Sequence, residues 1–342
     1  MRIALDAVGG DFAPEQVVQG GVDAHRRLGV EVVFVGPRER VDAALTAAGA
    51  GKWAQIEEAP ETIGMDEHPA QAVRAKKASS IVRGIAMVAS ERAQAFVSAG
   101  NSGAVMAAAL FGLKRTAGVE RPALITAIPT REHPCYLLDV GANVDPEPEH
   151  LLQWGIMGSL YAERVMAINS PRVALLSIGE EPEKGNSLVR RAEPLFRAAG
   201  SLNFVGNVEG KDIFRGKADV VVCDAFSGNV LIKTAEGVAE FLLTAVRDAL
   251  KADPLATLGG LLARGRLQSI RRRADWREFG GALLLGVNGV AVVAHGRSDR
   301  RAIESAIRVA RDAVERNVLA AIAQSSAAAG PTVAQPLKAE GS

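Results

Sequence analysis

The sequence has few aromatic residues and almost no excess of charge. Phe, Trp and Tyr make up 4% of its 342 residues, which disfavours the aromatic platforms on which single-stranded nucleic acids stack. Lysine and arginine number 40 against 39 aspartates and glutamates, so the formal net charge is +1. A surface coated in nucleic-acid-binding charge would be far more basic. We therefore predict no nucleic-acid partner.

Cysteine and long hydrophobic runs are also scarce. Only Cys135 and Cys223 are present, each inside an apolar run, and no CxxC or paired Cys/His spacing suggests zinc. We predict two reduced, buried thiols and neither a metal nor a cofactor. The start, Met1–Asp6, lacks the features of a signal peptide, and no apolar segment has bilayer-spanning length. We expect a cytoplasmic protein.

Short apolar runs alternate with longer helix-like segments along the chain. The runs are continuously hydrophobic, which suits strands covered on both faces. This alternation predicts an α/β fold of three layers, with helices on both sides of a mainly parallel sheet. The expected strands are Ile3–Leu5, Glu31–Val35, Ala95–Ser98, Cys135–Leu138, Val173–Ser177, Leu202–Val205 and Val220–Cys223, and the expected helices include Pro14–Leu28, Ala70–Ala89, Gly103–Leu113 and Pro148–Ala162.

The last part of the chain has a different pattern. Phe279–His295 holds two apolar runs around a Gly-Val-Asn-Gly turn, which predicts two strands joined as a hairpin. Ser298 or Asp299 then caps a final helix that reaches about residue 324. We expect one domain over residues 1–326, followed by a disordered tail at 327–342.

Five expected strands end in loops rich in Gly and in Asn or Asp. A single loop of this kind is ordinary turn chemistry, but five at strand ends suggest a ligand crevice lined by backbone N–H groups. None of them matches GxxxxGK[ST] or GxGxxG, so support for a nucleotide site is weak. The loops are Asp6–Asp11, Ser98–Gly103, Asp139–Asp145, Ile178–Asn186 and Asp224–Asn229.

Three basic side chains lie in or near these loops. Lys184 is inside the fourth loop, and Lys233 follows Asn229 by one helical turn. His295 ends the run Val-Ala-Val-Val-Ala, at another strand end. Each of them is placed to meet a phosphate oxygen or a developing oxyanion, although a solvated surface role remains open for both lysines.

Taken together, these segments resemble the PlsX family of acyl-carrier-protein:phosphate acyltransferases. The resemblance runs from residue 1 to about 324, in conserved order and spacing. The segments that carry it are Met1–Pro14, Ser98–Gly103, Leu138–Asp145, Leu176–Asn186, Val220–Lys233, Phe279–Ala282 and Ala294–Asp299.

The resemblance implies a fold like that of phosphotransacetylases and isopropylmalate-type dehydrogenases, and a reaction in which inorganic phosphate attacks a long-chain acyl thioester on acyl carrier protein. The product, acyl phosphate, feeds phospholipid synthesis, and a homodimer is expected. We expect Lys184, Asn229 and His295 to be catalytic, with Lys184 as the first choice for charge stabilisation. The candidate substrate-binding residues are Asp6, Gly9, Gly10, Asn101, Gly103, Asp139, Asn143, Gly185, Asn186, Asp224, Gly228 and Lys233.

Residues 238–277 predict a protruding helical hairpin with an apolar tip beside arginines. Its glycines weaken a regular core helix, although a core helix with a basic end remains an alternative. Such a tip suits peripheral contact with an anionic membrane, including the downstream membrane acyltransferase there, or docking of acidic acyl carrier protein. The candidate contact residues are Leu255, Leu258, Leu262, Arg264, Arg266, Arg271, Arg272 and Arg273.

Two other functions remain open from the sequence. An NAD-dependent β-decarboxylating dehydrogenase could use a similar fold, but we find neither its metal-binding carboxylates nor its cluster of substrate-binding arginines. A non-enzymatic membrane-attached scaffold would not explain so many Gly/Asn loops at strand ends.

Overall fold

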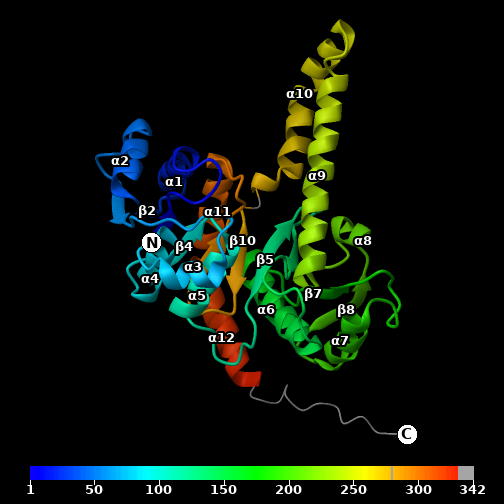
Figure 1. Ribbon diagram of the computed structural model, residues 1–342. Coiled ribbons are helices and arrows are strands. Elements are labelled where there is room, and N and C mark those ends of the chain that lie inside the picture. The colour runs from blue at the N-terminus through cyan, green and yellow to red at the C-terminus, as the bar shows by residue number, and fades with distance from the viewer. Residues whose placement is uncertain (279, 330–342) are drawn as a thin grey trace.

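The computed structural model describes residues 1–278 and 280–329, apart from the side chains at 269–274, 276, 328 and 329. Its centre is an eleven-stranded sheet in the order β3-β2-β1-β4-β11-β10-β5-β6-β9-β7-β8 (Figure 1). The strands are β1 Arg2–Asp6, β2 Glu31–Gly36, β3 Gln55–Glu58, β4 Ala95–Ser98, β5 Ala123–Ile128, β6 Cys135–Leu138, β7 Arg172–Leu176, β8 Asn203–Val208, β9 Val220–Val222, β10 Ala282–Leu285 and β11 Val290–Val293.

Helices cover both faces of this sheet, as the sequence predicts. One apolar core lies between the sheet and α1 (Glu15–Leu28), α2 (Arg38–Ala47), α6 (Pro148–Met166), α7 (Ser187–Ala198), α11 (Arg300–Glu315) and α12 (Val318–Ala329). The second core lies under α3 (Pro69–Ala75), α4 (Ser80–Ala89), α5 (Ser102–Gly112), α8 (Gly210–Arg215) and the first turns of α9 (Ala225–Ala249). The three-layer α/β/α fold is therefore confirmed.

The sheet consists of two parallel halves that run in opposite directions. Three successive neighbours, β11–β10, β10–β5 and β5–β6, pair antiparallel, and the other pairs in the sheet are parallel. An odd number of reversals puts the carboxyl ends of β1, β4 and β11 at one edge of the sheet, here called the first edge. The carboxyl ends of β6, β9 and β7 lie at the opposite, second edge. The expectation that all five loops share one crevice edge is therefore wrong.

Local structure departs from the sequence prediction in several further places. The single helix expected over Ala70–Ala89 is two helices, because buried Ser79 accepts a hydrogen bond from the Val82 N–H and caps a new start at α4. Strands β3 and β5 were not predicted. The β10–β11 hairpin is confirmed, but two helices, α11 and α12, follow it instead of one.

The chain end differs from its prediction as well. Helix α12 continues to Ala329, three residues past the expected domain limit. The rest of the predicted tail, 330–342, lies outside the described residues.

Helices α9 and α10 (Pro254–Ala274) project from the body as a long hairpin, here called the arm (Figure 1). Its base is held where the chain returns to the body: buried Asp275 pairs with Arg277 at 2.7 Å and with Arg301 at 3.2 Å. Arg277 also reaches Asp299, the N-cap residue of α11, at 2.8 Å. These ion pairs fasten the arm to the helix that follows the hairpin strands. Of the helices in the described ranges, none is both long and apolar enough to cross a bilayer.

Candidate active site

A cavity of about 720 Å³ lies between α9 and one face of the sheet, along the length of β5. It begins at the second edge, near Gly141 and Asn229, and reaches the first edge at Ser102, His295 and Ser298. The cavity thus joins loops that the opposed sheet halves hold far apart. Most of its wall is apolar, including Leu124, Ala127, Ile128, Pro129, Val140, Phe214, Ile232, Ala235, Ala239, Ala282, Val293 and Ala302.

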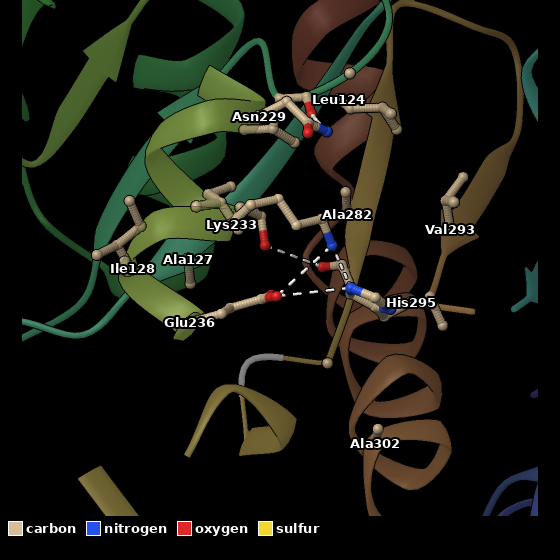
Figure 2. A pocket seen from close by; sticks show the side chains of 18 of the residues that line it. Leu124, Ala127, Ile128, Asn229, Lys233, Glu236, Ala282, Val293, His295 and Ala302 are labelled. Carbon is tan, nitrogen blue, oxygen red and sulfur yellow. Dashed lines mark hydrogen bonds and ion pairs between the residues drawn. The ribbon is translucent and has the colours of Figure 1, made fainter. Parts of the chain in front are cut away.

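Charged side chains gather at one part of this wall (Figure 2). Lys233 Nζ contacts His295 Nε2, and both lie 3.6 Å from the same oxygen, Oε2 of Glu236. Arg297 reaches Glu236 at 3.3 Å from the loop after β11. We call Lys233, Glu236 and His295 the charged cluster. It brings two predicted residues together, although one comes from a helix and the other from a strand end 62 positions away.

The carboxylate of Glu236 is held ionised within the cluster. Burial alone would raise its pKa, but the hydrogen bond to His295 and the positive charges of Lys233 and Arg297 outweigh burial, so that the pKa lies below its usual range. The backbone N–H of Arg297 donates a hydrogen bond to His295 Nδ1 at 3.3 Å, and this bond fixes the orientation of the imidazole ring. Nε2 therefore faces Lys233 and Glu236.

At the first edge, Asp6 ties two of the predicted loops together. The Ser98 hydroxyl donates to Asp6 Oδ2 at 2.7 Å, and the same hydroxyl accepts from the Gly100 N–H at 3.0 Å. A side chain at Gly9 would place Cβ 2.4 Å from Asp6 Oδ2. Only glycine allows this approach. Burial raises the pKa of Asp6, against the hydrogen bond from Ser98. Asp6 therefore fixes these two loops.

Asn101 also acts within the protein. Its Oδ1 accepts from the Ala104 N–H and caps α5, while its amide donates to the carbonyls of Gly64, Met65 and Glu67. Asn101 therefore holds the 64–67 segment, whose Met65 lines the cavity. Two predicted glycines pack nearby: Gly103 lies against Pro69, and Gly10 against the Gly296 carbonyl.

At the second edge, Asp139 organises the loop after β6. Its two carboxylate oxygens accept from the backbone N–H groups of Leu124, Gly141, Ala142 and Asn143, and from the Asn143 side chain, at 2.8–3.1 Å. Burial raises the pKa of Asp139, and these donors oppose that rise. Asp139 and Asn143 are thereby used in shaping the loop, which brings Gly141 to the cavity.

The start of α9 packs directly on that loop. Asp224 caps the helix by accepting from the Ser227 N–H at 2.8 Å, and a Cβ at Gly228 would lie 2.0 Å from the Asp139 carbonyl oxygen. Asn229 donates to the Val140 carbonyl at 3.2 Å and lines the cavity (Figure 2). This contact sets the path along which α9 carries Lys233 and Glu236 toward His295.

Lys184, Gly185 and Asn186 lie outside the cavity wall. Their loop follows β7, which is separated from β5 by β6 and β9 in the sheet. Three strand spacings correspond to roughly 14 Å. Lys184 is exposed, Gly185 has a φ of 106°, and Asn186 caps α7 by accepting from the Val189 N–H. The structure therefore brings Asn229, Lys233 and His295 together and leaves Lys184 apart.

Sequence reasoning missed Glu236 and Ser298, which both line the cavity. Glu236 follows Lys233 by three residues, a spacing that places two side chains on one helix face, so this signal was available. Ser298 was considered only as a helix cap, and the structure gives that role to Asp299. Within the part of the chain that the structure describes, no three His, Cys, Asp or Glu side chains group as metal ligands.

The chain is similar to known proteins along most of its length. A sequence model of the family described as fatty acid synthesis protein matches residues 1–321. A phosphate acyltransferase from Heliobacterium modesticaldum is 51% identical over 94% of this chain and 96% of its own length. One from Pelotomaculum thermopropionicum is 48% identical over 93% of each chain.

A solved structure supports the fold alone. A phosphotransacetylase from Streptococcus pyogenes superposes with a TM-score of 0.59 at 20% identity, covering 92% of this chain and 94% of that one. The sequence matches extend over nearly the whole chain and include every segment discussed above up to residue 321. The protein therefore belongs to the PlsX family of phosphate acyltransferases and is an acyltransferase.

Proposed function

We propose that the protein transfers a long-chain acyl group from acyl carrier protein to inorganic phosphate, giving acyl phosphate for phospholipid synthesis. The single observation that carries this proposal is the cavity itself, an apolar space that ends at Lys233 and His295. Long acyl chains need an apolar wall, and phosphate needs positive charge. The relatives are named phosphate acyltransferases, which supports phosphate as the acceptor of the acyl group.

In the proposed reaction, a phosphate oxygen attacks the thioester carbonyl carbon, and the carbon–sulfur bond breaks. The electron pair leaves with sulfur, and the proton lost by phosphate is transferred to the thiolate. Lys233 and His295 hold the phosphate near the carbonyl and stabilise the tetrahedral oxyanion. Asn229 holds the start of α9 on the loop after β6 and so positions Lys233. No nucleophile of the enzyme is required, because phosphate is the nucleophile.

Palmitoyl-acyl carrier protein and phosphate are the substrates with which to test this reaction. The thioester should be lost only when phosphate is present. Hydroxylamine added after the carrier protein has been removed would convert the acyl phosphate to the hydroxamate. Thioester loss that does not depend on phosphate would contradict the proposal. A parallel incubation with a 2-hydroxy acid and NAD, followed by nicotinamide absorbance, tests the dehydrogenase alternative.

We further propose that the arm makes the contacts outside the body, with a second copy of the chain and with the inner face of the cell membrane or the carrier protein. Apolar side chains are exposed on both arm helices, reaching 70% exposure at Phe241 and 82% at Leu262. Patches of this kind mark interaction sites. Leu255 and Leu258 are exposed as well, and so are Arg264 and Arg266. The side chains of Arg271, Arg272 and Arg273 lie outside the described residues.

Two substitutions separate the roles of the arm. Leu258→Glu should weaken sedimentation with anionic liposomes while leaving turnover of soluble substrate unchanged. Phe241→Glu, on α9, should shift the protein from dimer to monomer in sedimentation velocity. Unchanged liposome binding by the first variant would contradict a membrane contact at the arm tip. An unchanged sedimentation coefficient for the second would contradict a dimer contact through α9.

A further inference from the structure

The turn between β11 and α11 contains a hydroxyl group that the fold leaves without a partner. Ser298 is 1% exposed, and its Oγ makes no hydrogen bond to any described residue. Its backbone N–H donates to the His295 carbonyl at 2.9 Å, so the residue itself is well ordered in the turn. Ser298 also lines the cavity.

This isolation is unusual, because buried polar groups in proteins nearly always find a hydrogen-bond partner. A serine at this position would ordinarily cap the helix, but Asp299 does so instead, accepting from the Arg301 and Ala302 N–H groups at 3.1 Å. The Ser298 hydroxyl therefore neither caps the helix nor bonds to a described residue. A buried hydroxyl without a protein partner is a donor that a bound ligand can engage.

The surroundings of Ser298 select an anion. Lys233 and His295 line the same cavity as Ser298 and supply the groups that attract an anion. The N-terminus of the neighbouring helix α11 is already capped by the Asp299 carboxylate. The acidic group facing Lys233 and His295 is Glu236, which lies 3.6 Å from each. An incoming dianion would take the place of this carboxylate on Lys233 and His295.

We propose that Ser298 Oγ donates a hydrogen bond to the phosphate substrate, in a subsite completed by Lys233 and His295. The inference rests on the proposed function, since it assumes that inorganic phosphate is the acceptor. It adds the location of that acceptor: the first-edge end of the cavity, at the β11–α11 turn. The apolar length beside β5 is then left for the acyl chain.

Ser298→Ala has opposite expected effects on stability and on phosphate binding. Removing a buried hydroxyl that lacks a partner should leave the melting temperature of the ligand-free protein unchanged or raise it. The phosphate KM should rise about 10- to 100-fold, the range expected for losing a hydrogen bond to a charged group. The KM for acyl carrier protein substrate should not change. A merely structural role would not separate these three quantities.

Ser305→Ala is the matched control. Ser305 is also buried on α11, but its hydroxyl accepts from Arg308 at 3.3 Å and it does not line the cavity. This variant should keep the wild-type phosphate KM. The rise in melting temperature with added inorganic phosphate gives a second readout, which should be smaller for Ser298→Ala than for wild type.

The outcomes separate the two proposals. If wild-type protein shows no phosphate-dependent loss of thioester, the proposed function fails. If wild type is active but Ser298→Ala keeps its phosphate KM, the subsite assignment is overturned. A Ser298→Ala protein with a lower melting temperature and equal losses for both substrates would also overturn it, because that pattern indicates a structural hydroxyl.

Discussion

Replacing Glu236 by glutamine should lower the phosphate KM, because the carboxylate competes with phosphate for Lys233 and His295. Its Oε2 atom lies 3.6 Å from Lys233 Nζ and from His295 Nε2. One ion pair at that separation is worth about 1 kcal/mol at the dielectric constant of water and about 5 kcal/mol at an effective value of 20. Lys233 is half exposed, so the lower end applies.

Phosphate must offset this attraction before it binds the same side chains, so removing the charge of Glu236 should strengthen phosphate binding by about 1 kcal/mol, or roughly fivefold in KM. The assay is the initial rate of hydroxamate formation across a phosphate series. Glu240→Gln is the control, since exposed Glu240 pairs with Arg297 at 3.4 Å but does not line the cavity. A phosphate KM that stays constant or rises in Glu236→Gln would refute the competition.

Three further predictions concern the fold and the sequence-based assignments. Gly228→Ala places Cβ 2.0 Å from a backbone carbonyl oxygen and should lower the free energy of unfolding in urea by about 2–4 kcal/mol. Gly237→Ala meets no atom within 4 Å and should raise it by up to about 1 kcal/mol. Equal urea midpoints for the two variants would contradict the packing of α9. Asp275→Asn should cost about 2–3 kcal/mol at pH 7. Burial would raise the pKa of Asp275, but Arg277 outweighs it and lowers the pKa below the usual 3.8. Ionised Asp275 therefore stabilises the folded protein fully above about pH 4, and this contribution is lost as pH falls through the folded-state pKa. The unfolding curves of wild type and Asp275→Asn should converge in acid. Lys233→Ala should reduce kcat/KM for phosphate by about 10- to 100-fold. Lys184→Ala should leave turnover unchanged, because its loop lies outside the cavity wall and three strands from β5; a loss of turnover with the fold intact would return Lys184 to the site.

Much of the fold could be predicted from local sequence patterns. Continuous apolar runs such as Val220–Val222 are diagnostic of strands buried on both faces, and the turn between β10 and β11 identified their hairpin. The strand β3 was missed because its residues, Gln-Ile-Glu-Glu, are mostly polar and pair only with β2. Such an edge strand needs little hydrophobicity, so its sequence carries little signal.

Part of the candidate site could be predicted from the sequence. Asn229, Lys233 and His295 were identified from residue type and position near strand ends, and the structure brings them to one cavity. Glu236 was missed although it lies one helical turn from Lys233. Lys184 lies in a Gly/Asn loop as a site residue would, yet its loop is three strands from β5. The order of strands in the sheet cannot be predicted from the residues of one loop.

The sequence by itself determined the alternation of strands and helices, the positions of the Gly/Asn loops and the membership of the family, because each depends on residues close together in the chain. Only the tertiary structure decided which loops meet. The three antiparallel pairings around β10 and β5 reverse half of the sheet, and the direction of a strand depends on its neighbours rather than on its own residues. This reversal places the loops at two edges, and α9, crossing from the second edge to the first, brings Lys233 to His295.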